Sequence, residues 1–207
     1  MYCFIQTVSS IRQVRKRKGW NMQYNYLIRR KVLSFFGAQF HIYNPQQQLI
    51  GYCKQKAFKL KEDIRIYSDE TQSCEILHIQ ARNIIDFSAC YDVIDSQTGM
   101  VLGAWRRKGF TSLIRDNWEL LDVAGNVIGQ LKEDSLGLAL IRRLVCGLIP
   151  QKYDLVNMNG IQVRYSQCFN PFVFKLGVSI NPVFSIHPYL ILAGGILLAA
   201  IEGRQNN

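Results

Sequence analysis

The feature that most constrains this sequence is a hairpin-like unit that recurs along the chain. Each unit begins with an aromatic or aliphatic residue that has an apolar residue two positions away. A turn follows, which mostly opens with Asp or Asn and contains Gly. An aliphatic strand then returns, and it often includes a second Gly. The copies cover residues 40–52, 64–77 (the most degenerate), 91–103, 118–129 and 153–163. Residues two apart share one face of a strand, Asp or Asn bonds its own backbone in turns, and Gly supplies the positive φ of a tight return. The pattern therefore predicts five β-hairpins, with a bend or bulge at the second Gly.

Hairpins in this number predict a closed sheet. An open sheet of this size exposes its edges or curls, and closure into an antiparallel barrel removes both problems. A mainly β, closed antiparallel barrel is therefore expected, with a two-sheet sandwich as the alternative. The length of 207 residues and the hydrophobic content of 48% suit one domain with a sizeable core. One further helix is expected after Ser135, a helix-capping residue followed by leucines at helical spacing.

The C-terminal segment is apolar on every side. Residues 176–201 carry no formal charge, and Pro188 suits the first turn of a helix. A helix that is apolar all round must be buried in protein or in lipid. From residue 188 to 201 it would be about 21 Å long, shorter than the roughly 30 Å of a bilayer core. We therefore expect a core helix at about residues 188–201, with a membrane span that starts near Val183 as the alternative.

No catalytic or metal-binding pattern emerges from the sequence. His41, His78 and His187 are far apart, and the six cysteines form no C-x-x-C pair. Reduced, buried thiols and a cytoplasmic protein are expected, with peripheral association at the membrane as a variant of this location. There is no G-x-S-x-G elbow, Cys–His signature or phosphate-binding glycine loop. The expected domain is non-enzymatic and has no cofactor or obligatory metal; an enzyme whose site forms only in three dimensions is the alternative.

Basic residues point to an anionic partner. The formal net charge is +10, and five of the cations lie in residues 1–21, which contain no acid. Residues 1–21 are interpreted as a basic flexible tail or an extension upstream of the true start, and residues 22–207 as the barrel domain. The order of the tail, apolar before basic, does not suit a signal peptide. The candidate headgroup-binding residues, which could hold phosphate by charge-assisted bonds, are Arg29, Arg30, Lys31, Lys54, Lys56, Arg106, Arg107 and Lys108.

Two other interpretations compete with a headgroup site. Solvent-facing strand positions can be basic simply to protect edges and solubility. A small basic barrel can also bind nucleic acid. However, Phe40, Tyr91, Trp118 and Tyr153 occupy the hairpin position that predicts core packing, whereas stacking platforms would interleave with the lysines. Nucleic acid is therefore an alternative that this pattern disfavours.

The stretch Leu27–Ser34, followed by Phe40–Asn44, resembles the opening of LURP-one-related proteins and phospholipid scramblases. The likeness continues through the hairpins to Val163 and to the last apolar segment, and it covers roughly residues 23–201. It implies the tubby-like fold, a β-barrel around a central hydrophobic C-terminal helix. In the tubby branch such barrels bind phosphoinositides through basic surface residues, and scramblases are associated with calcium-linked movement of phospholipids.

This chain lacks two scramblase features, a proline-rich N-terminus and an Asp-rich loop of the calcium-binding D-x-D-x-D-G kind. The resemblance therefore implies peripheral binding of acidic phospholipid, phosphoinositide included, or of a partner protein. A membrane-anchored, scramblase-like protein is the alternative.

Overall fold

The computed structural model describes residues 24–31, 37–56, 63–83, 89–108, 117–133, 150–168, 173–183 and 186–201. The expected basic tail at residues 1–21 and the expected helix after Ser135 lie outside this part of the chain. The described residues form β1 (Tyr26–Arg30), β2 (Gly37–Tyr43), β3 (Leu49–Lys56), β4 (Asp63–Tyr67), β5 (Glu75–Asn83), β6 (Cys90–Asp95), β7 (Val101–Lys108), β8 (Asn117–Leu121), β9 (Val127–Glu133), β10 (Lys152–Asn157), β11 (Gly160–Cys168), β12 (Lys175–Ile180) and α3 (Pro188–Ile201).

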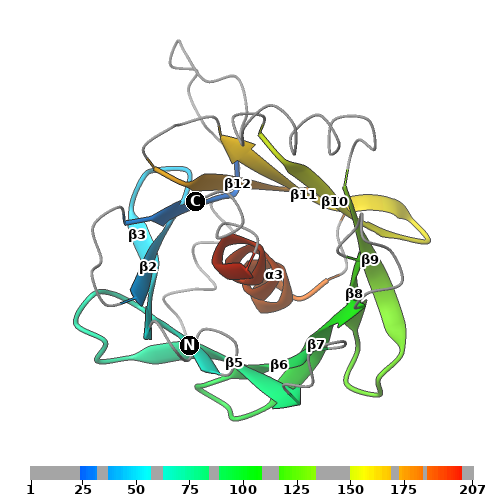
Figure 1. Ribbon diagram of the computed structural model, residues 1–207, viewed down its shortest axis with the longest axis horizontal. Helices are drawn as coiled ribbons and strands as arrows, with labels where there is room; N and C mark the ends of the chain where they lie inside the picture. The colour runs from blue at the N-terminus through cyan, green and yellow to red at the C-terminus, as the bar shows by residue number, and fades with distance from the viewer. Residues whose placement is uncertain are drawn as a thin grey trace.

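The strands form one closed antiparallel barrel, in which each strand pairs with its neighbours in sequence (Figure 1). Strand β1 closes the ring by pairing with β12, so that Ile28 lies opposite Leu176 and Arg29 opposite Lys175. The five predicted hairpins are all present as β2–β3, β4–β5, β6–β7, β8–β9 and β10–β11. The mainly β, closed-barrel architecture is thereby confirmed, and the two-sheet sandwich is wrong.

Glycines occupy the strained positions that the repeat predicted. In the turns, Gly99, Gly125 and Gly160 have φ angles of 71°, 88° and 93°, which L side chains rarely adopt. The second glycine of the unit lies where the strand register shifts, as at Gly103 opposite Val93. A Cβ added to Gly103 would lie 2.4 Å from a backbone carbonyl oxygen of β8, so only glycine fits there.

Helix α3 runs through the middle of the barrel (Figure 1). The predicted core helix is therefore confirmed, with the expected bounds. Every described side-chain position from Leu190 to Ala200 is buried, which is why the segment can be apolar on all sides. Among the described residues there is no helix with the length and apolar character needed to cross a membrane.

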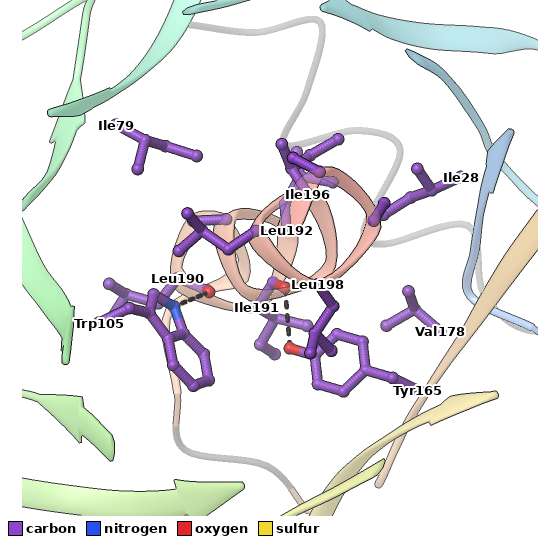
Figure 2. Packing of buried hydrophobic residues seen from close by; sticks show 14 of the residues in the cluster. Ile28, Ile79, Trp105, Tyr165, Val178, Leu190, Ile191, Leu192, Ile196 and Leu198 are labelled. Atoms are coloured by element: carbon purple, nitrogen blue, oxygen red, sulfur yellow. Dashed lines mark hydrogen bonds between the residues drawn. The ribbon is translucent and has the colours of Figure 1, made fainter. Parts of the chain in front are cut away.

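Two barrel side chains hold the helix by its backbone (Figure 2). The indole Nε1 of Trp105 donates to the carbonyl oxygen of Leu190, and the hydroxyl of Tyr165 donates to that of Ile191, both over 2.9 Å. Burial raises the pKa of Tyr165, so its hydroxyl stays a neutral donor. These bonds join β7 and β11 to the first turn of the helix and fix its depth in the barrel.

The up-and-down topology gives the barrel two different ends. The five hairpin turns and the β12–α3 link leave from one end, which we call the turn end. At the other end, which we call the loop end, lie the strand termini at residues 30, 37, 56, 63, 83, 90, 108, 117, 133, 152, 168 and 175.

Candidate anion-binding surface

The first predicted basic cluster lies on the outer face of β1, near the loop end. Side chains alternate between the two faces of a strand, and Ile28 is fully buried inside the barrel, so Arg29 points outward and is exposed. Lys31 continues the same outer row: its backbone N–H donates to the carbonyl oxygen of Gln39 over 2.9 Å, and its side chain is exposed.

Two further cations flank this row from the neighbouring strands. Lys175 on β12 is the direct cross-strand partner of Arg29, so the two side chains share the outer face. Lys54 on β3 is the partner of Gln39, the residue beside Lys31. From strand geometry, Arg29 and Lys31 lie about 7 Å apart and Lys31 and Lys54 about 10 Å apart. We call Arg29, Lys31, Lys54 and Lys175 the basic patch.

Within the described part of the chain, the four cations of the basic patch have no acidic partner. Like charges directly opposite each other on a sheet destabilise it, yet Arg29 faces Lys175. Among the described residues, no carboxylate lies within ion-pair distance of any of the four patch cations. Elsewhere on the outer face, by contrast, arginines are paired across strands: Arg65 with Glu75, Arg82 with Asp92, and Arg164 with Asp154.

The second predicted cluster lies on β7, on the opposite side of the ring from β1. There Arg106 and Lys108 both form ion pairs with the carboxylate of Glu119, with closest contacts of 2.5 Å. The side chain of Glu119 is only 4% exposed. Burial opposes ionisation of this carboxylate, but the hydrogen bonds from Lys108 and Arg106 together outweigh it, so its pKa is lowered. These two cations are therefore both paired with Glu119, although their own side chains remain 38% and 54% exposed.

The remaining predicted residues are not brought to the basic patch either. Arg107 belongs to the inward-facing positions of β7, and its guanidinium lies 5.9 Å from the centre of the Trp118 ring. Arg30 shares the inward parity of Ile28 and pairs with Phe40. Lys56 is the last residue of β3, and its side chain lies outside the described part of the chain. Of the eight predicted residues, Arg29, Lys31 and Lys54 thus contribute to the patch.

Lys175 is the residue that sequence reasoning missed. It stands 144 positions from Lys31 in the chain, alone at the edge of an uncharged stretch, and no local motif marks it. Its place follows only from the pairing of β1 with β12, which closes the barrel.

The described residues contain no group of three His, Cys, Asp or Glu side chains that could hold a metal ion. Comparison of the chain with protein-family models, with curated proteins and with solved structures found no match.

Proposed function

We propose that this barrel is a non-enzymatic domain that binds acidic phospholipid at a membrane surface through the basic patch. The observation that carries the proposal is the pairing of Arg29 directly opposite Lys175, with no carboxylate in range among the described residues. Repulsion between the two cations destabilises the free protein, and phosphate oxygens that bridge them offset this repulsion by charge-assisted hydrogen bonds. The likeness of Leu27–Ser34 to LURP-one-related and scramblase sequences supports the same class of ligand.

The expected affinity is modest. A basic side chain close to an anionic membrane contributes about 1 kcal/mol, so the four patch cations together provide roughly 4 kcal/mol. That corresponds to an association in the millimolar range, which is reversible and sensitive to salt. Such binding suits a protein that associates reversibly with the membrane surface. The basic residues at positions 12–18 would add further electrostatic attraction to an anionic membrane.

Co-sedimentation of the full-length protein with phosphatidylserine-containing vesicles tests the proposal, with neutral vesicles as the reference. The test variant is Lys31→Ser/Lys54→Ser. Its matched control is Lys132→Ser/Lys152→Ser, which removes two exposed lysines from the loop-end halves of β9 and β10. Two lost contacts of about 1 kcal/mol each should weaken binding by roughly thirtyfold in the test variant. The control should stay within about threefold of the wild type.

Equal losses in both variants would mean that any cation on the barrel serves, and the patch would not be a site. Absence of wild-type binding at low salt would end the lipid proposal and direct the search to protein partners. Both variants are repeated in a full-length background with serine at residues 12 and 15–18, because binding by that segment would otherwise mask the barrel.

A further inference from the structure

The exposed apolar residues of the barrel gather at the turn end. All seven exposed large apolar side chains among the described residues lie in, or next to, the turns of β6–β7, β8–β9 and β10–β11 or in the link after β12. These strands are consecutive around the ring, so the side chains occupy one continuous side of that end. Met158 and Val183 are the most exposed, at 104% and 86%. We call this set the turn-end surface: Met100, Val101, Val123, Val127, Met158, Ile161 and Val183.

The turn-end surface is also acidic. Asp95 ends β6 at this end of the barrel, Asp122 opens the β8–β9 turn, and the neighbouring β4–β5 turn contains Asp69 and Glu70, whereas none of the turns contains Lys or Arg. Hydrogen bonds from the side chain and the backbone of Asn126 lower the pKa of Asp122, so its charge persists well below neutral pH. A surface that is apolar and negatively charged fits an apolar and positively charged occupant.

This chain contains such a segment. Residues 1–23 carry five cations, no acid and apolar side chains that include Phe4, Ile5 and Trp20. After it, Asn25 lies beside β12 near the turn end: its N–H donates to the carbonyl oxygen of Val178, and its side-chain Oδ1 accepts from the N–H of Ile180, both over 2.7 Å. The side chain of Tyr24 lies over Gly177, and its hydroxyl is 3.5 Å from Sγ of Cys168. Twenty-three residues can span about 75 Å, three times the roughly 25 Å width of a barrel of this strand number.

We propose that residues 1–23 dock on the turn-end surface of the same molecule. The cations at positions 12–18 lie against Asp95 and Asp122, and the apolar side chains of the segment cover Val123, Met158 and Val183. The contact joins the start of the chain to the end of the barrel opposite the strand termini where the basic patch lies. Residues 1–23 are therefore bound at the turn end, and the basic patch stays uncovered.

Limited trypsin digestion of the full-length protein tests this contact, because the turns offer trypsin no cleavage site while residues 12–18 offer five. Initial cleavage rates in residues 12–18 are measured by mass spectrometry at low and high salt. A synthetic peptide of residues 1–23 supplies the unprotected rate. The wild type should be cut at least tenfold more slowly than the peptide at low salt, and protection should fall as salt rises.

Two variants weaken the surface without disturbing the turns. Asp95→Asn/Asp122→Asn removes two charges. Each asparagine still has a side-chain oxygen that can accept a hydrogen bond from the backbone N–H of Gln97 or Asn126. This double variant should raise the cleavage rate by roughly tenfold, about threefold per carboxylate. Val123→Ser/Met158→Ser alters only exposed side chains and should raise it similarly.

The matched control is Asp63→Asn/Asp92→Asn, which removes two carboxylates from the loop-end halves of β4 and β6 and should leave the wild-type rate unchanged. Cleavage of the wild type at the peptide's rate would overturn the proposal. Protection that neither turn-end variant reduces would overturn it too, because the segment would then lie elsewhere. Protection that grows with protein concentration would place the segment on a second copy and would also refute docking within one molecule.

Discussion

Two adjacent glycines in the core helix should respond differently to the same substitution, because only one of them lies against side chains that cannot move. A Cβ on Gly194 would lie 2.5 Å from Cζ2 of Trp105 and 2.9 Å from the hydroxyl of Tyr165. Both rings are anchored to helix carbonyl oxygens (Figure 2), so neither can retreat without losing a bond. A Cβ on Gly195 would meet only Cδ1 of Ile28 closely, at 2.6 Å, and that methyl group is the end of a flexible side chain.

The magnitudes separate the two variants. Alanine is favoured over glycine inside a helix by about 1 kcal/mol at either position. For Gly194→Ala, overpacking costs about 1–3 kcal/mol and the displaced ring loses a hydrogen bond that is worth about 1 kcal/mol. The net expectation is a loss of about 1–3 kcal/mol in the free energy of unfolding. For Gly195→Ala the helix gain offsets the small adjustment of Ile28, and the net change should stay within about 1 kcal/mol of zero.

Urea unfolding of the full-length variants, followed by circular dichroism and tryptophan fluorescence, measures this difference, provided the m-value is unchanged. The double variant Gly194→Ala/Trp105→Phe is the check on mechanism, because the smaller ring makes room for the methyl group. The cost of Gly194→Ala should therefore fall by at least about 1 kcal/mol in that background. If Gly194→Ala proved as stable as Gly195→Ala, the close packing of helix and barrel deduced from the structure would be refuted.

Three further outcomes are expected. Gln47 has a left-handed φ of 64°, as Gln72 of the β4–β5 turn has one of 59°, whereas the turns of β6–β7, β8–β9 and β10–β11 have glycine in this conformation. The substitution Gln47→Gly should therefore raise the free energy of unfolding in urea by about 0.5–1 kcal/mol; a loss would contradict the assigned turn. Glu119→Gln should cost about 1–2 kcal/mol at pH 7. Because the folded pKa of Glu119 is lowered, its contribution is present above the unfolded value and is lost as pH falls, so the variant and the wild type should converge below about pH 4. Burial raises the pKa of the Cys53 thiol to about 12, so Cys53 should resist a thiol reagent at pH 8 until the barrel unfolds, while the exposed Cys74 reacts at once.

Much of the barrel was predictable because its information is local. Each hairpin needs a strand of period two, a turn residue such as Asp95 and a glycine such as Gly99, all within about a dozen positions. The helix was predictable for a different reason: residues 189–201 are apolar on every face, and only burial can satisfy such a helix. Closure followed from the number of hairpins, since free edges are a liability.

The candidate site was only partly predictable because its residues come from distant strands. Charge clusters in the sequence identified Arg29, Lys31 and Lys54, but they equally identified Arg106 and Lys108. What separates the two sets is Glu119, which reaches the second set through the pairing of β7 with β8. A linear pattern cannot tell a cation that faces a buried carboxylate from one that faces solvent.

Local information was thus enough to predict the hairpins, the closed sheet and the buried helix, because backbone geometry and hydrophobic burial act on residues that are near one another in the chain. Which of the described cations lie beside a carboxylate and which do not depends instead on how the strands pair in three dimensions. The pairing of β1 with β12 brings Lys175 beside Arg29, and the up-and-down topology sorts acidic, apolar turns to one end of the barrel. Electrostatic interactions depend on distance in space, and that distance is defined only when the ring closes.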